Sequence, residues 1–217
     1  MATVANTPRI SARTAAICAI VWGVVVGGGF VAMARYKATP GVMAEAPARW
    51  PEGTRLARAE GRPTLVMFAH PRCTCTRASL AELRKLAAER SFDTVIAFLS
   101  PKGAPADFVQ SDLWTSANAI PGARVVRDEG GALAARFGAG TSGATLLYAR
   151  DGALLFRGGI TPSRGHEGDS FGKERVLALL DGRPADRSDA PVFGCQLADA
   201  DTARLSHPEV SHPRGNP

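Results

Sequence analysis

The chain has 217 residues, a length that suits one domain with appendages. Its formal net charge is +6, but the basic residues are scattered among acidic ones, which argues against nucleic-acid binding because that function needs a clustered basic surface. The four cysteines are too few for a disulfide scaffold and do not form the paired CxxC motifs of a zinc site.

The N-terminal region predicts a membrane anchor. Residues 14–34 (TAAICAIVWGVVVGGGFVAMA) form an uncharged run of 21 residues, and a helix that rises about 1.5 Å per residue crosses a hydrocarbon core of about 30 Å with that length. A cleaved signal peptide is the alternative, but its apolar core is usually about 7–15 residues long and ends at small residues. This run ends instead at Arg35, Tyr36 and Lys37.

The positive charges on the two sides of the run nearly balance, so they do not set its orientation. The short N-terminal tail is expected to stay inside, because such a tail translocates poorly without a signal of its own. We expect residues 1–13 to be a cytoplasmic tail and residues 14–34 to be an uncleaved, single-pass anchor in the inner membrane. The soluble domain is then expected in the periplasm. Cys18 lies within the expected span and is predicted to pack there as a small apolar residue.

Two segments flanking the central region lack periodic apolar positions. Residues 35–62 contain several prolines and are interpreted as a linker and lead-in. Residues 183–217 are interpreted as a C-terminal extension whose last fifteen or so residues are disordered. The predicted domain therefore spans residues 63–182.

Apolar runs and helical periodicity alternate within this domain. Strands are predicted at 64–69, 94–99, 123–126, 145–149 and 153–157, and helices at 75–90, 106–117, 131–137 and 172–180. Strand–helix alternation implies parallel pairing with right-handed crossovers. The Asp151-Gly152 turn between the last two strands predicts a hairpin, which adds an antiparallel edge.

Cys73 and Cys75 stand between the first predicted strand and the helix that follows it. The free amides and the dipole at a helix N-terminus stabilise a thiolate, so we expect the pKa of Cys73 to fall. Arg72 and Arg77 add positive charge nearby. Cys73 is therefore the predicted nucleophile and Cys75 the resolving thiol. The alternative is an unreactive pair or a static disulfide, and the one-residue spacing predicts that any bridge is strained and readily reduced.

The order of these segments resembles the thioredoxin-like superfamily over residues 50–182. The resemblance rests on the strand–Cys–helix unit, on residues 125–131 and 135–138 (VVRDEGG and ARFG), and on residues 143–148 (GATLLY) running into the hairpin. Within this superfamily, the chain is most similar to the membrane-anchored periplasmic branch, which includes the cytochrome-maturation thiol reductases and the RedB-like proteins. The resemblance implies a thioredoxin-like three-layer α/β/α sandwich with a mixed central sheet.

This resemblance also implies a function. It indicates a monomeric thiol–disulfide oxidoreductase, without a cofactor, that acts on periplasmic protein thiols or disulfides. Cys73 attacks, a mixed disulfide forms, and Cys75 releases it. A non-catalytic binding module that retains only the fold is a further alternative.

Three positions depart from the pattern of this superfamily. Thr76 stands where the second cysteine of CxxC is usual, and Arg72 replaces an aromatic residue. Ala144, directly before Thr145, replaces the cis-proline that shapes the peptide-binding loop and keeps metal away from the cysteines. These departures weaken an ordinary dithiol-exchange assignment and strengthen a metal role. The pair Cys73 and Thr76 also leaves a CxxT pattern like that of thiol peroxidases.

His166 lies in a polar loop, residues 161–170, between the hairpin and the last helix. Two thiolates and an imidazole are suitable ligands for Cu(I) or zinc. The copper chaperones of cytochrome oxidase assembly combine a thioredoxin-like fold with two cysteines and a distal histidine. A copper-binding protein that uses Cys73, Cys75 and His166 is therefore the main alternative function, set against a solvated surface histidine.

Two auxiliary residues complete the predicted site. His70 precedes the cysteines and is placed either to take the thiol proton or to bond the backbone at the strand end. Cys195 lies in a short apolar patch, residues 192–195, of the C-terminal extension. It is expected either to dock on the domain as a third thiol or to be a buried, inert cysteine.

Overall fold

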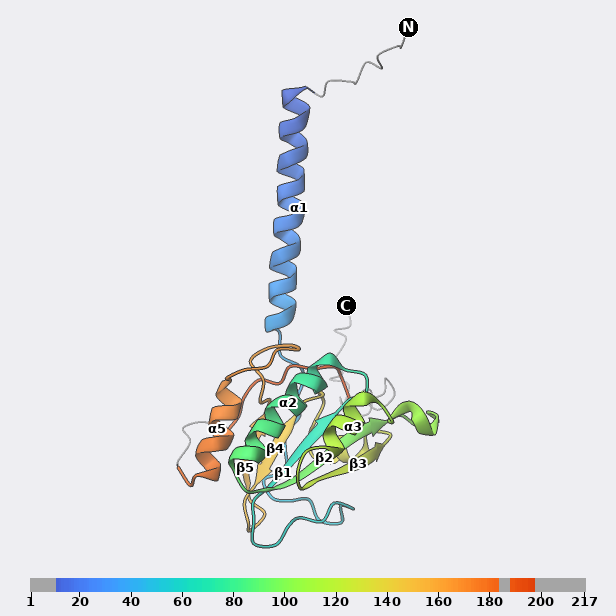
Figure 1. Ribbon diagram of the computed structural model, residues 1–217, viewed down its shortest axis with the longest axis vertical. Coiled ribbons are helices and arrows are strands. Elements are labelled where there is room, and N and C mark those ends of the chain that lie inside the picture. The colour runs from blue at the N-terminus through green and yellow to red at the C-terminus, as the bar shows by residue number, and fades with distance from the viewer. Residues whose placement is uncertain (1–10, 184–187, 198–217) are drawn as a thin grey trace, which may run out of the picture. The chain divides into compact units, whose positions relative to one another are not determined.

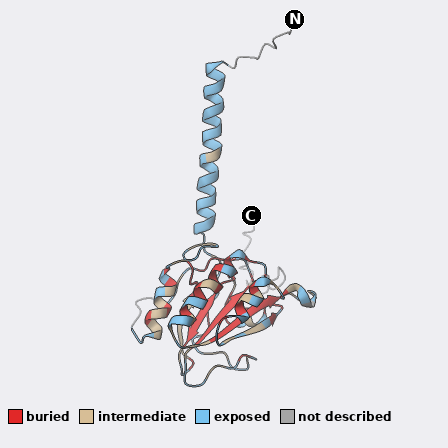
Figure 2. Ribbon diagram, in the orientation of Figure 1, coloured by how far each residue is buried: buried red, intermediate tan, exposed pale blue. Residues whose placement is uncertain are grey.

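The computed structural model describes residues 11–183 and 188–197. It divides into two compact units, one ending at Thr39 and one beginning at Pro40. The first contains helix α1 (Ala12–Ala38), whose N-cap residue Ser11 accepts a hydrogen bond from the backbone amide of Thr14. No residue of α1 is buried, as Figure 2 shows, and the helix is long and apolar enough to cross a membrane. It covers the whole run 14–34 that the sequence predicted as an apolar helix.

The second unit alternates strands and helices in the predicted order (Figure 1). Its elements are β1 (Thr64–Ala69), α2 (Thr74–Glu89), β2 (Asp93–Ser100), the 3-10 helix η1 (Ala106–Phe108), α3 (Asp112–Asn118), β3 (Ala123–Glu129), α4 (Ala132–Arg136), β4 (Thr145–Tyr148), β5 (Leu154–Gly158) and α5 (Phe171–Leu180). The five strands form one sheet in the order β3-β2-β1-β4-β5. β1, β2 and β3 are parallel, whereas β4 and β5 pair antiparallel, so the predicted mixed sheet is confirmed.

The central strand β1 is buried at every position, which is typical of a strand covered on both faces. Leu65 and Met67 pack beneath α2, α3 and α5, which lie together on one face of the sheet (Figure 1). Val66 and Phe68 point to the opposite face, because successive strand residues alternate. That second face is covered by the short helix α4 and by irregular chain, so the second helical layer of the sandwich is thin.

Two predicted elements differ from the structure. The expected helix 106–117 is divided into η1 and α3, because Ser111 caps α3 by accepting a hydrogen bond from the Trp114 amide at 3.3 Å. The expected strand 123–126 continues to Glu129, because β3 pairs in register with β2 as far as Ser100. The remaining elements agree with their predicted bounds within a few residues.

The compact unit also extends beyond residues 63–182 on both sides. Ala46 and Leu56 of the lead-in, and Val192 and Leu197 of the C-terminal extension, are buried against the second face of the sheet. They occupy space that the five-residue helix α4 does not cover. The expected cytoplasmic tail, except its last three residues, and the expected disordered C-terminal residues lie outside the described residues.

Candidate thiol site

The connection from β1 to α2 presents Cys73 at the first turn of a helix. Cys73 is the N-cap residue of α2, with an extended backbone, and its amide donates to the His70 carbonyl oxygen at 3.3 Å. Its side chain is only 2% exposed and that of Cys75 only 6%. The structure therefore places the two predicted cysteines side by side, beneath the surface, at the end of the central strand.

A third cysteine reaches this site from the far end of the chain. We name residues 188–197 the C-terminal strap. The Arg157 amide donates to the Ser188 carbonyl oxygen at 2.9 Å, which anchors the strap along β5. Near its other end the Ser142 amide donates to the Cys195 carbonyl oxygen at 2.7 Å, and the Leu197 amide donates to the Gly140 carbonyl oxygen at 3.0 Å. Cys195 itself is exposed, yet its thiol lies near enough to Cys73 to affect the pKa of that residue.

The three thiols differ in pKa because a negative charge on one of them disfavours ionisation of the other two. Hydrogen bonds from the thiols of Cys75 and Cys195, together with the backbone amides of Thr76 and Cys195, outweigh burial and hold the pKa of Cys73 well below its usual range. The hydrogen bond to Cys73 and burial raise the pKa of Cys75. Burial and the contact with Cys73 likewise raise the pKa of Cys195. The ionised form is therefore favoured at Cys73, and the neutral form is favoured at its two neighbours.

Buried hydroxyl groups tie the strand end, the helix and the loop before β4 together. The Thr76 hydroxyl donates to the His70 carbonyl oxygen at 2.9 Å and lies 2.6 Å from the Ser142 hydroxyl. The His70 amide in turn donates to the Ser142 hydroxyl at 3.0 Å. The side chain of Thr76 is thus engaged beneath the site, and its backbone amide, not its hydroxyl, is the group that lowers the pKa of Cys73.

The residues at the expected cis-proline position continue the strand pairing toward the thiols. The Phe68 amide donates to the Ala144 carbonyl oxygen at 2.8 Å, and the Gly143 amide donates to the Phe68 carbonyl oxygen at 2.7 Å. The buried Thr145 hydroxyl donates to the Gly143 carbonyl oxygen at 3.1 Å. Ala144 and Thr145 therefore fix the backbone that holds Ser142, without a direct contact to a thiol that the structure records.

His70 is half-buried, and its imidazole Nδ1 accepts a hydrogen bond from the Arg72 amide at 3.2 Å. Burial lowers the pKa of His70, although the neighbouring Cys73 charge opposes this effect. Its ring is therefore neutral near pH 7. The structure thus shows the backbone-bonded arrangement that was one of the two expectations, with the imidazole still close enough to Cys73 for the two charges to interact.

The two arginines expected to add positive charge are directed elsewhere. The Arg72 guanidinium lies 4.5 Å from the centre of the Phe108 ring, and Arg77 forms an ion pair with Asp112 of α3. The largest stabilisation of the Cys73 thiolate comes from thiol and amide donors instead. The two guanidinium groups therefore contact η1 and α3, and their expected effect on the Cys73 thiolate stays a prediction.

The loop containing His166 does reach the site, but through its backbone. A hydrogen bond from the Gly165 backbone lowers the pKa of Cys75 and partly offsets the effect of the Cys73 charge. The exposed His166 ring is turned to the Arg164 carbonyl oxygen, 2.7 Å from its Nδ1. Among residues 11–183 and 188–197, no three His, Cys, Asp or Glu side chains are grouped to hold a metal ion. The alternative ligand set of Cys73, Cys75 and His166 is therefore not assembled.

Three contributors to the site carried no local signal in the sequence. Ser142 links the strap to the hydroxyl pair, and Gly165 contacts Cys75. Arg164 donates to the Gly194 carbonyl oxygen at 2.6 Å, and its charge lowers the pKa of Cys195 against the larger effects that raise it. All three belong to loops brought together by sheet pairing between distant segments, so only the fold reveals them.

Comparisons with known proteins give the fold. No protein-family model and no curated protein matches the chain. An uncharacterized conserved protein from Geobacillus kaustophilus aligns with 75% of this chain and 89% of its own, at 21% identity and a TM-score of 0.55. A hypothetical protein from Sinorhizobium meliloti aligns with 75% of this chain and 96% of its own, at 21% identity and a TM-score of 0.54.

A third solved structure, an exposed lipoprotein thioredoxin from Streptococcus pneumoniae, aligns over 57% of this chain and 86% of its own, at 21% identity and a TM-score of 0.40. The first two likenesses show a shared fold. The domain has a thioredoxin-like α/β fold, in which a mixed five-stranded sheet carries the cysteine-bearing helix directly after its central strand.

Proposed function

We propose that this protein is a membrane-anchored thiol–disulfide oxidoreductase of the RedB-like type that acts on periplasmic protein partners. The observation that carries the proposal is the position of Cys73: a buried residue at the N-terminus of α2, with the thiols of Cys75 and Cys195 near enough to lower its pKa. A static structural cysteine has no need of such neighbours, whereas a nucleophile gains from them, because the thiolate is the reactive form.

The proposed reaction transfers two electrons from the site to a partner disulfide. The Cys73 thiolate attacks one partner sulfur, a Cys73–partner disulfide forms, and the other partner sulfur leaves as a thiolate that takes up a proton. A second thiol of the site then loses its proton and attacks the Cys73 sulfur. The partner leaves fully reduced and the site keeps an intramolecular disulfide. Cys75 is the resolving thiol that the sequence predicts, and an external dithiol regenerates the site.

The test is a redox titration of the full chain in detergent micelles. Mixtures of reduced and oxidised glutathione set the potential, and alkylation followed by mass spectrometry counts the free thiols. We expect a two-electron couple that disappears in Cys73→Ser and persists in Cys18→Ser, the matched control outside the site. Thiols that stay unreactive across the whole range would leave the protein as a non-catalytic thioredoxin-fold module.

The same sample tests the copper alternative. Titration with Cu(I) in a competing chelator is expected to show no stoichiometric site that depends on His166, since its ring is turned to the Arg164 carbonyl oxygen. Tight binding of one Cu(I) that is lost in His166→Ala and in Cys73→Ser would replace the oxidoreductase assignment with metal delivery.

A further inference from the structure

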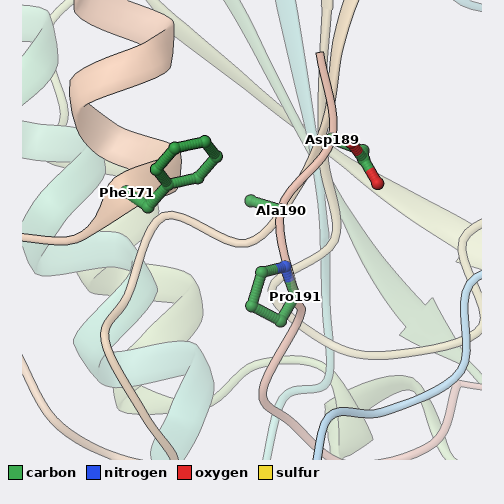
Figure 3. A pocket seen from close by; sticks show the side chains of 4 residues that line it. All are labelled: Phe171, Asp189, Ala190 and Pro191. Atoms are coloured by element: carbon green, nitrogen blue, oxygen red, sulfur yellow. The ribbon is translucent and has the colours of Figure 1, made fainter. Parts of the chain in front are cut away.

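The C-terminal strap is a built part of the domain. Beside α5, a pocket lined by Phe171, Asp189, Ala190 and Pro191 marks where the strap passes the start of that helix (Figure 3). Beyond it, Val192, Phe193 and Leu197 are buried. No cysteine lines the pocket.

Backbone hydrogen bonds hold the strap on both sides of Cys195. The Arg164 side chain binds the carbonyl oxygen of the residue before it, and Leu197 pairs with Gly140 after it. The carbonyl oxygen of Cys195 itself accepts from Ser142. Its amide and its thiol both lower the pKa of Cys73. Hydrogen bonds thus fix the ten-residue strap on both sides of one exposed cysteine, whose carbonyl oxygen binds the loop beside the nucleophile.

Cys75 is the less suitable partner for a disulfide with Cys73. Only Thr74 separates the two residues, and Thr74 and Cys75 already belong to the first turn of α2. A disulfide imposes a dihedral angle near 90° and a Cβ–Cβ separation of about 3.8 Å, so closing so small a ring distorts that turn. Cys195 has no such constraint, because its chain approaches Cys73 from a separate segment.

We propose that Cys195 is a second resolving thiol, and that the Cys73–Cys195 disulfide is the main oxidised product of the site. This inference rests on the thiol–disulfide activity proposed above and names the residue that completes it. Cys75 then acts chiefly as the buried hydrogen-bond donor that keeps Cys73 ionised. Arg164 acts as a positioning residue, because it holds the strap and its charge favours the Cys195 thiolate.

The partner disulfide is the oxidant in this reaction and accepts both electrons. After the first attack, Cys73 is joined to the partner and carries no charge. Cys195 releases its proton to solvent, and its sulfur attacks the Cys73 sulfur while the Cys73–partner bond breaks. The departing partner thiolate takes up a proton. The partner has gained two electrons, and Cys73 and Cys195 have each lost one.

The charge on Cys73 also determines when Cys195 can react. Before reaction, the negative charge on Cys73 is one of the causes that raise the pKa of Cys195. That charge is gone in the mixed disulfide, whereas the Arg164 charge remains and still lowers the pKa of Cys195. The Cys195 thiolate is therefore more populated only after Cys73 has reacted, which keeps the thiol poised but unreactive toward other oxidants.

The experiment treats the reduced full chain in detergent with oxidised glutathione, quenches it at intervals with acid, and maps the products after trypsin digestion. Cleavage after Arg72 and Arg77 leaves Cys73 and Cys75 together in peptide 73–77, whereas Cys195 falls in peptide 188–204. A disulfide to Cys195 therefore joins two peptides, and one between Cys73 and Cys75 stays within one. We expect the joined pair to be the main product in the wild-type chain.

Variants then assign the resolving thiol. In Cys195→Ser we expect the Cys73–glutathione adduct to persist about tenfold longer than in the wild type, whereas in Cys75→Ser the joined peptides still form. Arg164→Gln is expected to slow resolution without slowing the first attack, and Arg164→Lys to restore part of the rate. Circular dichroism checks that each variant is folded. The peptide map of the wild-type chain identifies the disulfide by itself, so that result does not depend on the folding of any variant.

Two outcomes overturn the inference in distinguishable ways. If the adduct persists in Cys75→Ser but not in Cys195→Ser, or if the wild-type product lies within peptide 73–77, then Cys75 alone resolves and the proposed oxidoreductase function remains. If no adduct forms at Cys73 in any folded variant, the oxidoreductase function itself fails, and the role of Cys195 fails with it.

Discussion

At the scale of single residues, the arrangement separates three chemically identical thiols by their hydrogen bonds. The neighbouring thiols of Cys75 and Cys195 lower the pKa of Cys73, so its ionised form is the favoured one. Cys75 and Cys195 are the donors, so their neutral forms are favoured. The site therefore contains one nucleophilic thiolate and two protonated thiols, and the three can be distinguished by the pH dependence of their reactivity.

The alkylation rate of Cys73 is expected to remain high at pH 6. An ordinary thiol has a pKa of about 8.5 and loses most of its reactivity there, but the pKa of Cys73 is lowered, so its thiolate persists. Cys195, whose pKa is raised, is expected to react appreciably only in strongly alkaline solution. Iodoacetamide labelling followed by peptide mass spectrometry measures both thiols in one sample. Equal pH profiles for the two cysteines would contradict the assignment.

Thr76→Val separates a chemical role of the hydroxyl from a structural one. The variant keeps the shape and the backbone amide of residue 76 but removes a buried group that bonds His70 and Ser142. We expect the free energy of unfolding to fall by about 1–3 kcal/mol, because buried polar groups lose a partner. The labelling rate of Cys73 is expected to stay within about twofold, and a loss of hydrogen-peroxide turnover in this variant alone would favour the peroxidase alternative instead.

At the scale of elements, a buried carboxylate connects α2 to α5 and to the loop beside Cys75. The side chain of Glu82 is fully buried, and it binds Lys85 at 2.7 Å, Lys173 of α5 at 2.9 Å and the Gly168 amide at 2.9 Å. Gly168 and Gly165 belong to the same loop, so this cluster supports the backbone that contacts Cys75. Removing one member leaves the remaining buried charge without its partner.

Glu82→Gln is expected to lower the free energy of unfolding by about 3 kcal/mol. Glu89→Gln is the matched control, because Glu89 lies exposed on the same helix. Although burial opposes it, the bonds from Lys85, Lys173 and Gly168 hold the pKa of Glu82 below its usual value. The stabilisation is therefore present above the unfolded-state pKa of about 4.3 and is lost as the pH falls through the lower, folded-state value. Urea unfolding at pH 7 and pH 3 measures both effects, and equal losses in the two variants would contradict this account.

The sequence predicted the elements that follow from local patterns and missed those held by distant contacts. Buried strands and the amphipathic helix α2 were predicted because their apolar periodicity is visible within a few residues. The strap was interpreted as part of an extension outside the domain, because residues 188–197 form no helix and pair with the sheet only by isolated bridges. The sequence therefore predicts no specific contact for Cys195. The strand–Cys–helix order, in contrast, places Cys73 correctly at the start of a helix.

At the scale of the whole chain, two units of opposite character are joined. The domain buries its apolar residues around a sheet, whereas α1 leaves large apolar side chains such as Trp22 and Phe30 exposed along its length. An exposed apolar surface of that extent is unfavourable in water and marks a surface that is covered by something else. The length of α1 matches a lipid bilayer, and a thiol–disulfide couple functions most readily in an oxidising compartment.

The full chain is expected to remain in the membrane fraction after alkaline carbonate extraction and to keep residues 1–37 in its intact mass. The physical reason is that the uncharged run of α1 is 21 residues long, beyond the apolar core of about 7–15 residues of a cleaved signal peptide, and Arg35 and Lys37 follow it in the last turn. A chain that starts at Pro40 is the control: we expect it to be soluble, because the second compact unit begins there, and to retain the Cys73 labelling rate. Recovery of the native protein in the soluble fraction, with its N-terminus near residue 38, would instead identify α1 as a cleaved signal sequence.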